Sequence, residues 1–168
     1  MPRKTRVSGM NINIICIGKL KEKYWQDAVK EYSKRLGSYC TLQIIELKES
    51  PLRANASAAD ELAVKEAESK EILRRIRDGD YVISLEIQGK SFTSEHLAEH
   101  IEKLGIDGRS TVDFVIGGSL GLSAEVSRRA DLKLSFSAMT FPHQMMRVIL
   151  LEQIYRSFKI IRHETYHK

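Results

Sequence analysis

Five short strand-like runs alternate with longer segments of helical periodicity along most of the chain. The predicted strands cover 11–17, 41–47, 81–87, 111–117 and 132–136. The predicted helices cover 24–36, 57–77, 94–104, 123–130 and 143–161. Strands separated by helices form parallel pairs, and a parallel sheet needs helices on both of its faces. The chain is therefore predicted to be an α/β protein with a mainly parallel sheet.

A length of 168 residues suits one domain with a substantial core and is too short for two ordinary ones. Hydrophobic residues make up 42% of the chain and charged residues 29%, the balance of a folded globular protein. We expect a single domain over 10–168. Residues 1–9 carry three basic side chains and no apolar periodicity, so we interpret them as a disordered extension or as an upstream start.

No apolar run approaches the roughly 20 residues that span a bilayer, and no secretory leader is recognisable. We therefore expect a cytoplasmic protein without a membrane partner. Cys16 and Cys40 form no cluster with other metal-ligating residues and are interpreted as reduced thiols. The net charge of +5 would favour a polyanionic partner, but it does not identify RNA.

Ligands of parallel α/β sheets bind beyond the carboxyl ends of the strands. This rule points to the loops that follow Leu85, Ile116 and Phe136. The second loop contains paired glycines in "GGSLG" (117–121), which let a backbone approach a ligand closely. A tight strand-to-helix turn explains the same residues equally well.

The third loop leads into "FPHQMMR" (141–147), where Pro142 suits the first position of a helix. His143 and Arg147 then lie one helical turn apart. The final segment, "RHETYHK" (162–168), combines a tyrosine and two histidines, which are side chains suited to proton transfer. A solvated tail is the simpler interpretation of that segment.

Two short motifs suggest other chemistry. The segment "HLAEH" (96–100) matches the H-x-x-E-H pattern of some zinc peptidases, but one apolar stripe with a polar flank also explains this helix. The segment "GKS" (89–91) ends like a phosphate-binding loop, yet Ser84 stands where the first glycine is required. We expect no metal and no hydrolysis of nucleoside triphosphates.

Several separated segments together resemble the ribosomal RNA large subunit methyltransferase H family of the SPOUT superfamily. The likeness runs over 10–168, and the segments occur in order with appropriate spacing. They are "GKLKEKYWQDAVKEYSKRL" (18–36), "LEIQGK" (85–90), "FVIGGSLGL" (114–122), "LSFSAMTFPHQMMRVILLEQIYR" (134–156) and "YHK" (166–168). The resemblance implies that the C-terminal part of the α/β fold is threaded into a trefoil knot.

The resemblance also implies S-adenosyl-L-methionine as cofactor. Its contacts, transferred motif by motif, are Leu85, Gly117, Phe136, Ser137, Ala138, Met139, Thr140 and Phe141. The implied enzyme is a homodimer with the first and last helices at the interface, and its C-terminal tail reaches the partner's cofactor.

The implied reaction methylates N3 of a pseudouridine in 23S rRNA, on the assembled ribosome. Candidates for proton removal are His143, Tyr166 and His167, and candidates for contacts with RNA are Arg147, Arg156 and Lys168. A zinc hydrolase and a non-catalytic RNA-binding module are the alternative functions.

Overall fold

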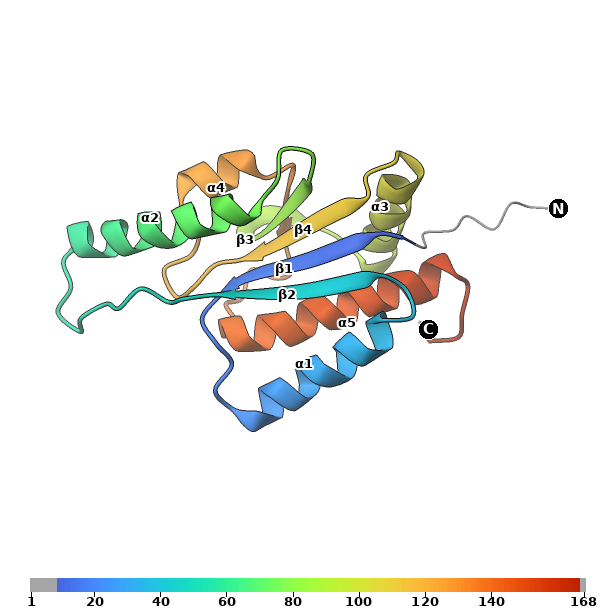
Figure 1. Cartoon of the computed structure of the whole chain (residues 1–168), viewed down its shortest axis with the longest axis horizontal. Helices are drawn as coiled ribbons and strands as arrows, with labels where there is room; N and C mark the ends of the chain where they lie inside the picture. Colours follow the sequence, from blue (N-terminus) through green and yellow to red (C-terminus); the bar gives the residue numbers. More distant parts are fainter. Residues whose placement is uncertain (1–8, 167–168) are drawn as a thin grey trace.

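The computed structural model describes residues 9–166 and contains five strands and five helices within that range (Figure 1). The strands are β1 (Asn11–Ile17), β2 (Thr41–Leu47), β3 (Tyr81–Ser91), β4 (Thr111–Ile116) and β5 (Leu132–Ser135). The helices are α1 (Lys23–Leu36), α2 (Ala58–Arg75), α3 (Ser94–Ile106), α4 (Ala124–Arg129) and α5 (His143–Ile161). Every predicted element is present. Of the extension predicted at 1–9, all but Gly9 lies outside the described residues.

The sheet has the strand order β2-β1-β4-β3-β5, and all of its neighbouring strands pair in parallel. Helices α1, α3 and α5 cover one face, and α2 and α4 cover the other (Figure 1). The predicted α/β class with a parallel sheet is therefore confirmed.

Two hydrophobic cores follow from the alternation of side chains along the central strands. On β1, Ile12, Ile14 and Cys16 face the core beneath α1, α3 and α5, whereas Ile15 and Ile17 face the core beneath α2 and α4. Because helices cover both faces of the sheet, the sequence of β1 is an almost continuous apolar run. Cys16 and Cys40 are buried, free thiols, as expected.

Strand β3 is longer than predicted because it leaves the sheet and then rejoins it. Leu85 and Lys90 both pair with Leu134 of β5, so the intervening residues 86–89 form a bulge at the carboxyl end of the sheet. Gly89 allows this close return, since a Cβ atom there would lie 2.6 Å from the carbonyl oxygen of Lys133. Lys90 and Ser91 are thus part of a strand and do not form a phosphate-binding loop.

Side-chain caps define where three of the helices begin. Ser57, Thr93 and Ser123 each accept a hydrogen bond from the backbone N–H three residues later. Helix α5 differs, because Pro142 occupies the capping position and His143 is the first helical residue. Pro142 therefore stands one position earlier than predicted. No helix among residues 9–166 has the length and apolar character needed to cross a membrane.

Candidate active site

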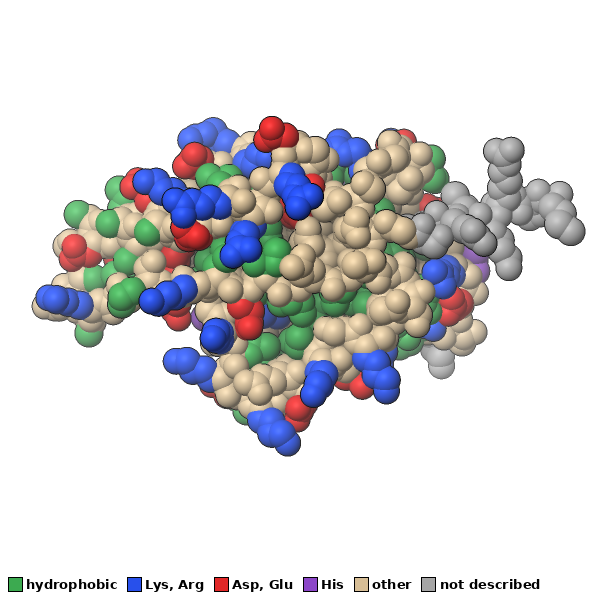
Figure 2. Space-filling view, in the orientation of Figure 1, with side chains coloured by type: hydrophobic (Ala, Val, Ile, Leu, Met, Phe, Trp, Pro, Cys, Tyr) green, Lys and Arg blue, Asp and Glu red, His purple; other side chains and the backbone are tan. Residues whose placement is uncertain are grey.

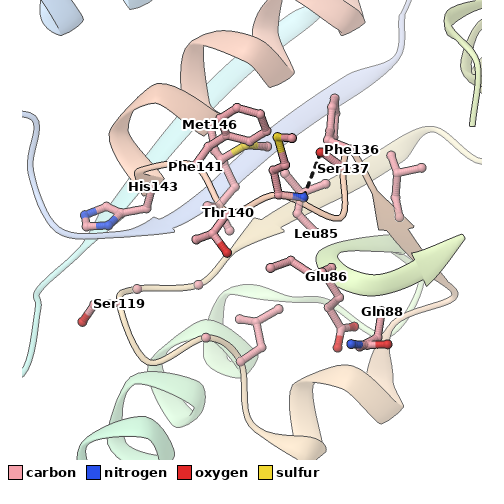
Figure 3. A pocket seen from close by; sticks show the side chains of 18 of the residues that line it. Leu85, Glu86, Gln88, Ser119, Phe136, Ser137, Thr140, Phe141, His143 and Met146 are labelled. Atoms are coloured by element: carbon pink, nitrogen blue, oxygen red, sulfur yellow. Dashed lines mark hydrogen bonds between the residues drawn. The ribbon is translucent and has the colours of Figure 1, made fainter. Parts of the chain in front are cut away.

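The loops after β3, β4 and β5 meet the first turn of α5 around a pocket of about 380 Å³ (Figure 3). This edge of the sheet is where the strand-end rule predicted a ligand. Of the predicted cofactor contacts, seven line the pocket: Leu85, Gly117, Phe136, Ser137, Met139, Thr140 and Phe141. Ala138 is exposed in the same loop and is not among the lining residues.

Local hydrogen bonds shape the loop between β5 and α5. The Ser135 hydroxyl donates to the carbonyl oxygen of Ser137 at 3.3 Å. The Ser137 hydroxyl in turn accepts a 3.0 Å hydrogen bond from the backbone N–H of Met139. These two hydrogen bonds define the shape of the loop. The side chains of Met139 and Phe141 are exposed at the pocket mouth.

The glycine segment after β4 folds into a tight turn that also forms one wall of the pocket. The Gly121 N–H donates to the Gly118 carbonyl at 3.0 Å, and Gly121 has a positive φ of 78°. A Cβ atom on Gly117 would lie 2.9 Å from the carbonyl carbon of Gly121. Gly117 is therefore required by the turn itself, and the same residue lines the pocket.

His143 lies at one margin of the pocket, and Glu86 and Gln88 lie at another (Figure 3). Burial lowers the pKa of the His143 imidazole, and the neighbouring Arg147 guanidinium lowers it further, while Glu49 acts in the opposite direction. The imidazole is thus neutral to a lower pH than an ordinary histidine. A neutral imidazole beside a pocket can accept a proton.

Arg147 is buried, and its placement contradicts the predicted contact with RNA. Only 2% of the Arg147 side chain is exposed. Its guanidinium donates to the Glu46 carboxylate at 2.9 Å and to the carbonyl oxygens of Ile17 and Gly18, both at 2.7 Å. A guanidinium enclosed in this way cannot meet a phosphate, so Arg147 joins α5 to the ends of β1 and β2 instead.

Tyr166 and Arg156 meet beside the second half of α5. The Tyr166 hydroxyl donates to Glu152 at 2.9 Å, and Arg156 both pairs with Glu152 at 2.7 Å and lies over the Tyr166 ring. Arg156 lies 13 residue steps beyond His143, which is about 20 Å of helix at 1.5 Å per step. Neither Tyr166 nor Arg156 lines the pocket. His167 and Lys168 lie outside the described residues.

The two histidines of the "HLAEH" segment have aromatic partners. The His96 ring stacks on Phe92 with their centroids 3.8 Å apart, and His100 Nε2 is 3.0 Å from the Tyr81 hydroxyl. Within residues 9–166 no three His, Cys, Asp or Glu side chains are grouped so that they could hold a metal ion. These histidines are therefore accounted for by packing.

Sequence reasoning missed four polar residues that line the pocket: Lys65, Glu86, Gln88 and Ser119. Glu86 and Gln88 belong to the bulge of β3, where two polar side chains follow an apolar strand in "LEIQG". That interruption of the strand pattern was a usable signal. Lys65 lies within a helix rich in charged residues, and no local pattern distinguishes it from its neighbours.

Basic side chains are spread over α1, α2 and α4 on the face seen in Figure 2, and acidic side chains lie between them. This face of the described chain presents mixed charge and no continuous basic patch. On this face the basic side chains are thus interspersed with acidic ones.

Comparison with known proteins relates the whole domain to methyltransferases. Residues 10–167 match the family model described as "Predicted SPOUT methyltransferase". A Clostridium novyi (strain NT) protein named "Ribosomal RNA large subunit methyltransferase H" is 58% identical over 159 residues, which are 95% of this chain and all of the relative. A Clostridium perfringens (strain SM101) protein, "Ribosomal RNA large subunit methyltransferase H 1", is 55% identical with the same coverage.

A solved structure shares the fold. The "putative methylase family protein" from Neisseria gonorrhoeae superposes with a TM-score of 0.50 at 10% sequence identity. The match covers 92% of this chain and 84% of that protein. At this identity the likeness concerns the architecture alone.

Proposed function

The chain belongs to the SPOUT methyltransferase family, and we propose that it transfers a methyl group from S-adenosyl-L-methionine to N3 of a pseudouridine in 23S rRNA. The proposed substrate is the assembled ribosome, which places the activity in the cytoplasm. The two Clostridium relatives are named as large subunit rRNA methyltransferases and match along their whole length, which supports a ribosomal RNA substrate.

The observation that carries the proposal is the convergence of three strand ends on one pocket. Leu85, Gly117 and the loop from Phe136 to Phe141 come from separate parts of the chain and enclose about 380 Å³. This volume lies within the range of about 300–1,000 Å³ typical of small-molecule sites. Leu85, Leu134, Phe136 and Met146 provide apolar walls suited to a nucleoside.

When bound, the cofactor supplies an activated methyl group, so the protein has to orient the target base and help to remove its N3 proton. His143 borders the pocket and has a lowered pKa, which suits a proton acceptor. The bonded loop from Ser135 to Met139 would hold the nucleoside in one orientation, which favours an aligned transfer.

We also propose a homodimer in which the C-terminal tail completes the partner's site. Tyr166 is bonded to Glu152 in the middle of α5, and Glu152 lies about 14 Å from His143 along the helix. In this proposed dimer, Tyr166, His167 and Lys168 of one copy take part in proton transfer or RNA binding at the site of the other copy. Arg156 remains a candidate RNA contact in this arrangement, whereas Arg147 does not.

The domain and knot expected from the resemblance form part of the same proposal. One core includes Met10 near one end and Phe158 near the other, which supports a single domain over 10–168. The chain passes from β5 at one edge of the sheet to Arg147, which is bonded to β1 and β2 at the other side. This crossing is compatible with a C-terminal trefoil knot.

Transfer of a radiolabelled methyl group tests the proposed function. The acceptors are ribosomes that lack the modification, their separated subunits and naked 23S rRNA. We expect incorporation into assembled ribosomes at one pseudouridine. Incorporation into none of these acceptors would overturn the proposed activity. Incorporation into naked RNA alone would overturn the requirement for assembly.

A further inference from the structure

The pocket has an apolar end and a polar end. Its apolar walls come from β5 and the loop that follows it, including Leu134 and Phe136. At the other end Glu86 and Gln88 extend from the bulge of β3 toward α4 (Figure 3). Lys65 of α2 also lines the pocket. Apart from His143, Lys65 and Glu86 are the ionisable residues among the described residues that line it.

The Glu86 carboxylate is held in place but has no cationic partner within residues 9–166. Its Oε2 atom accepts a 2.6 Å hydrogen bond from the Ser84 hydroxyl. The Ser127 hydroxyl of α4 lies 3.0 Å from Oε1 and 3.1 Å from Oε2. Two hydroxyl donors leave acceptor positions free on a half-buried carboxylate, because each carboxylate oxygen can accept more than one hydrogen bond.

Lys65 forms no ion pair with Glu86, although both side chains line the same pocket. A carboxylate and an ammonium group that are not paired with each other therefore both line an otherwise mainly apolar cavity. A ligand with an apolar or aromatic body and a zwitterionic end complements this arrangement.

We propose that Glu86 and Lys65 recognise the amino acid end of the methyl donor, with Glu86 accepting hydrogen bonds from its α-ammonium group and Lys65 pairing with its α-carboxylate. This inference rests on the proposed function, since it assumes that the pocket binds S-adenosyl-L-methionine. The pair also accounts for selectivity. A zwitterion satisfies both charges, whereas a nucleotide phosphate could pair only with Lys65 and would be repelled by Glu86.

Glu86 could instead serve only to connect the β3 bulge to α4 through Ser127, and variants separate these two roles. Glu86→Gln removes the charge but keeps a hydrogen-bonding side chain of the same size. Ser127→Ala removes the connection to α4 but keeps the charge. Lys65→Met removes the other charge. Glu66→Gln and Lys70→Met are the matched controls, because both residues are exposed on α2 and lie outside the pocket lining.

Titration calorimetry with three ligands tests the proposal. S-adenosylmethionine and S-adenosylhomocysteine carry the amino acid end, and 5′-methylthioadenosine lacks it. We expect Glu86→Gln and Lys65→Met each to weaken binding of the first two ligands by about tenfold or more, as for loss of a charge-assisted hydrogen bond. Binding of 5′-methylthioadenosine should change less than about twofold in every variant, because that ligand does not reach the pair.

Any of the following results would contradict the proposal. Equal weakening of all three ligands would show that Glu86 and Lys65 only maintain the pocket. Weakening of S-adenosylmethionine but not of S-adenosylhomocysteine would place Glu86 beside the sulfonium instead of the amine. Unchanged binding in both variants would remove the pair from recognition altogether. If the unmodified protein binds none of the three ligands, the proposed function itself fails, and this outcome is distinct from the others.

Discussion

Arg147 and Glu46 form an ion pair with a 2.9 Å separation between Nη1 and Oε2, although 101 positions separate them in the sequence. The same guanidinium donates to the carbonyl oxygens of Ile17 and Gly18. Through these contacts one side chain joins the first turns of α5 to the carboxyl ends of two strands. His143, one turn before Arg147, is thereby positioned at the pocket.

Arg147→Met is expected to destabilise the fold, since it removes the guanidinium that pairs with Glu46 and that donates to the carbonyl oxygens of Ile17 and Gly18. Breaking a buried pair costs about 3–5 kcal/mol, and the lower end applies because about a third of Glu46 is exposed. Urea unfolding measures the change. Arg128→Met, at an exposed position on α4, should alter stability by less than about 0.5 kcal/mol. Equal stability of the two variants would contradict a structural role for Arg147.

Gly117→Ala is expected to distort the turn after β4, because its Cβ atom would lie 2.9 Å from backbone of Gly121. We expect a loss of about 1–3 kcal/mol in stability, the usual cost of overpacking, and weaker binding of S-adenosylmethionine. Gly79→Ala is the matched control, since no atom lies within 4 Å of its added Cβ atom. Thermal unfolding with and without the ligand measures both effects. Similar behaviour of the two variants would show that the turn tolerates a side chain.

Stability should depend on pH through Asp113, a fully buried residue of β4 that accepts a hydrogen bond from Asn13. Burial raises the pKa of the Asp113 carboxyl, and the adjacent Asp80 raises it further. Folding therefore favours the protonated form. This contribution to stability is complete below the ordinary aspartate pKa and is lost as the pH rises through the raised pKa.

Asp113→Asn removes this titration and tests it. Urea unfolding at about pH 5 and about pH 8 should show a smaller loss of stability in the variant than in the unmodified protein. The difference between the two proteins isolates Asp113 from other groups that titrate. Parallel loss of stability in both proteins would contradict the prediction.

His143→Gln is expected to lower kcat by about a hundredfold or more, as for loss of a general base, and to leave binding of S-adenosylmethionine nearly unchanged. Because the pKa of His143 is lowered, the acid limb of the pH–rate profile should lie below about pH 6.5 and disappear in the variant. His96→Gln is the control, since His96 packs against Phe92 outside the pocket. Retention of the acid limb in His143→Gln would assign proton transfer to another group.

Deletion of residues 166–168 is expected to abolish methyl transfer but to preserve folding and cofactor binding. If the tail acts on the partner's site, mixed dimers of the truncated chain and His143→Gln should contain one complete site. Random mixing makes about half of the dimers heterodimers, so activity should return to about a quarter of the normal value. Persistent inactivity of the mixture would indicate that the tail acts within its own chain, and full activity of the truncated protein would exclude the tail from catalysis.

The order of elements along the chain could be predicted because each one has a local signature. Ile12 to Ile17 form an apolar run, and Ser57 precedes a helical pattern as a cap. The position of the pocket could also be predicted, because the carboxyl ends of parallel strands lie at the same edge of the sheet. These inferences need only local periodicity and one general rule of α/β sheets.

The position of Arg147 could not be predicted in this way. In the sequence it follows His143 by one turn, so both residues were expected near the substrate. Its burial depends on Glu46 and on the carbonyl oxygens of Ile17 and Gly18, which local periodicity does not bring together. The full extent of β3 was missed for a similar reason, because the return of Lys90 to the sheet depends on pairing with Leu134.

The bulge of residues 86–89 departs from the sheet and rejoins it opposite the same residue, Leu134. A change in the length of the bulge therefore changes the side chains that line the pocket, and it does not shift the register of the five strands. Gly89 sets the limit on such changes, because the return passes directly over the backbone of Lys133. The acidic end of the pocket thus belongs to a segment that mutation and selection can remodel separately from the scaffold, so ligand preference can diverge among descendants that keep the same fold.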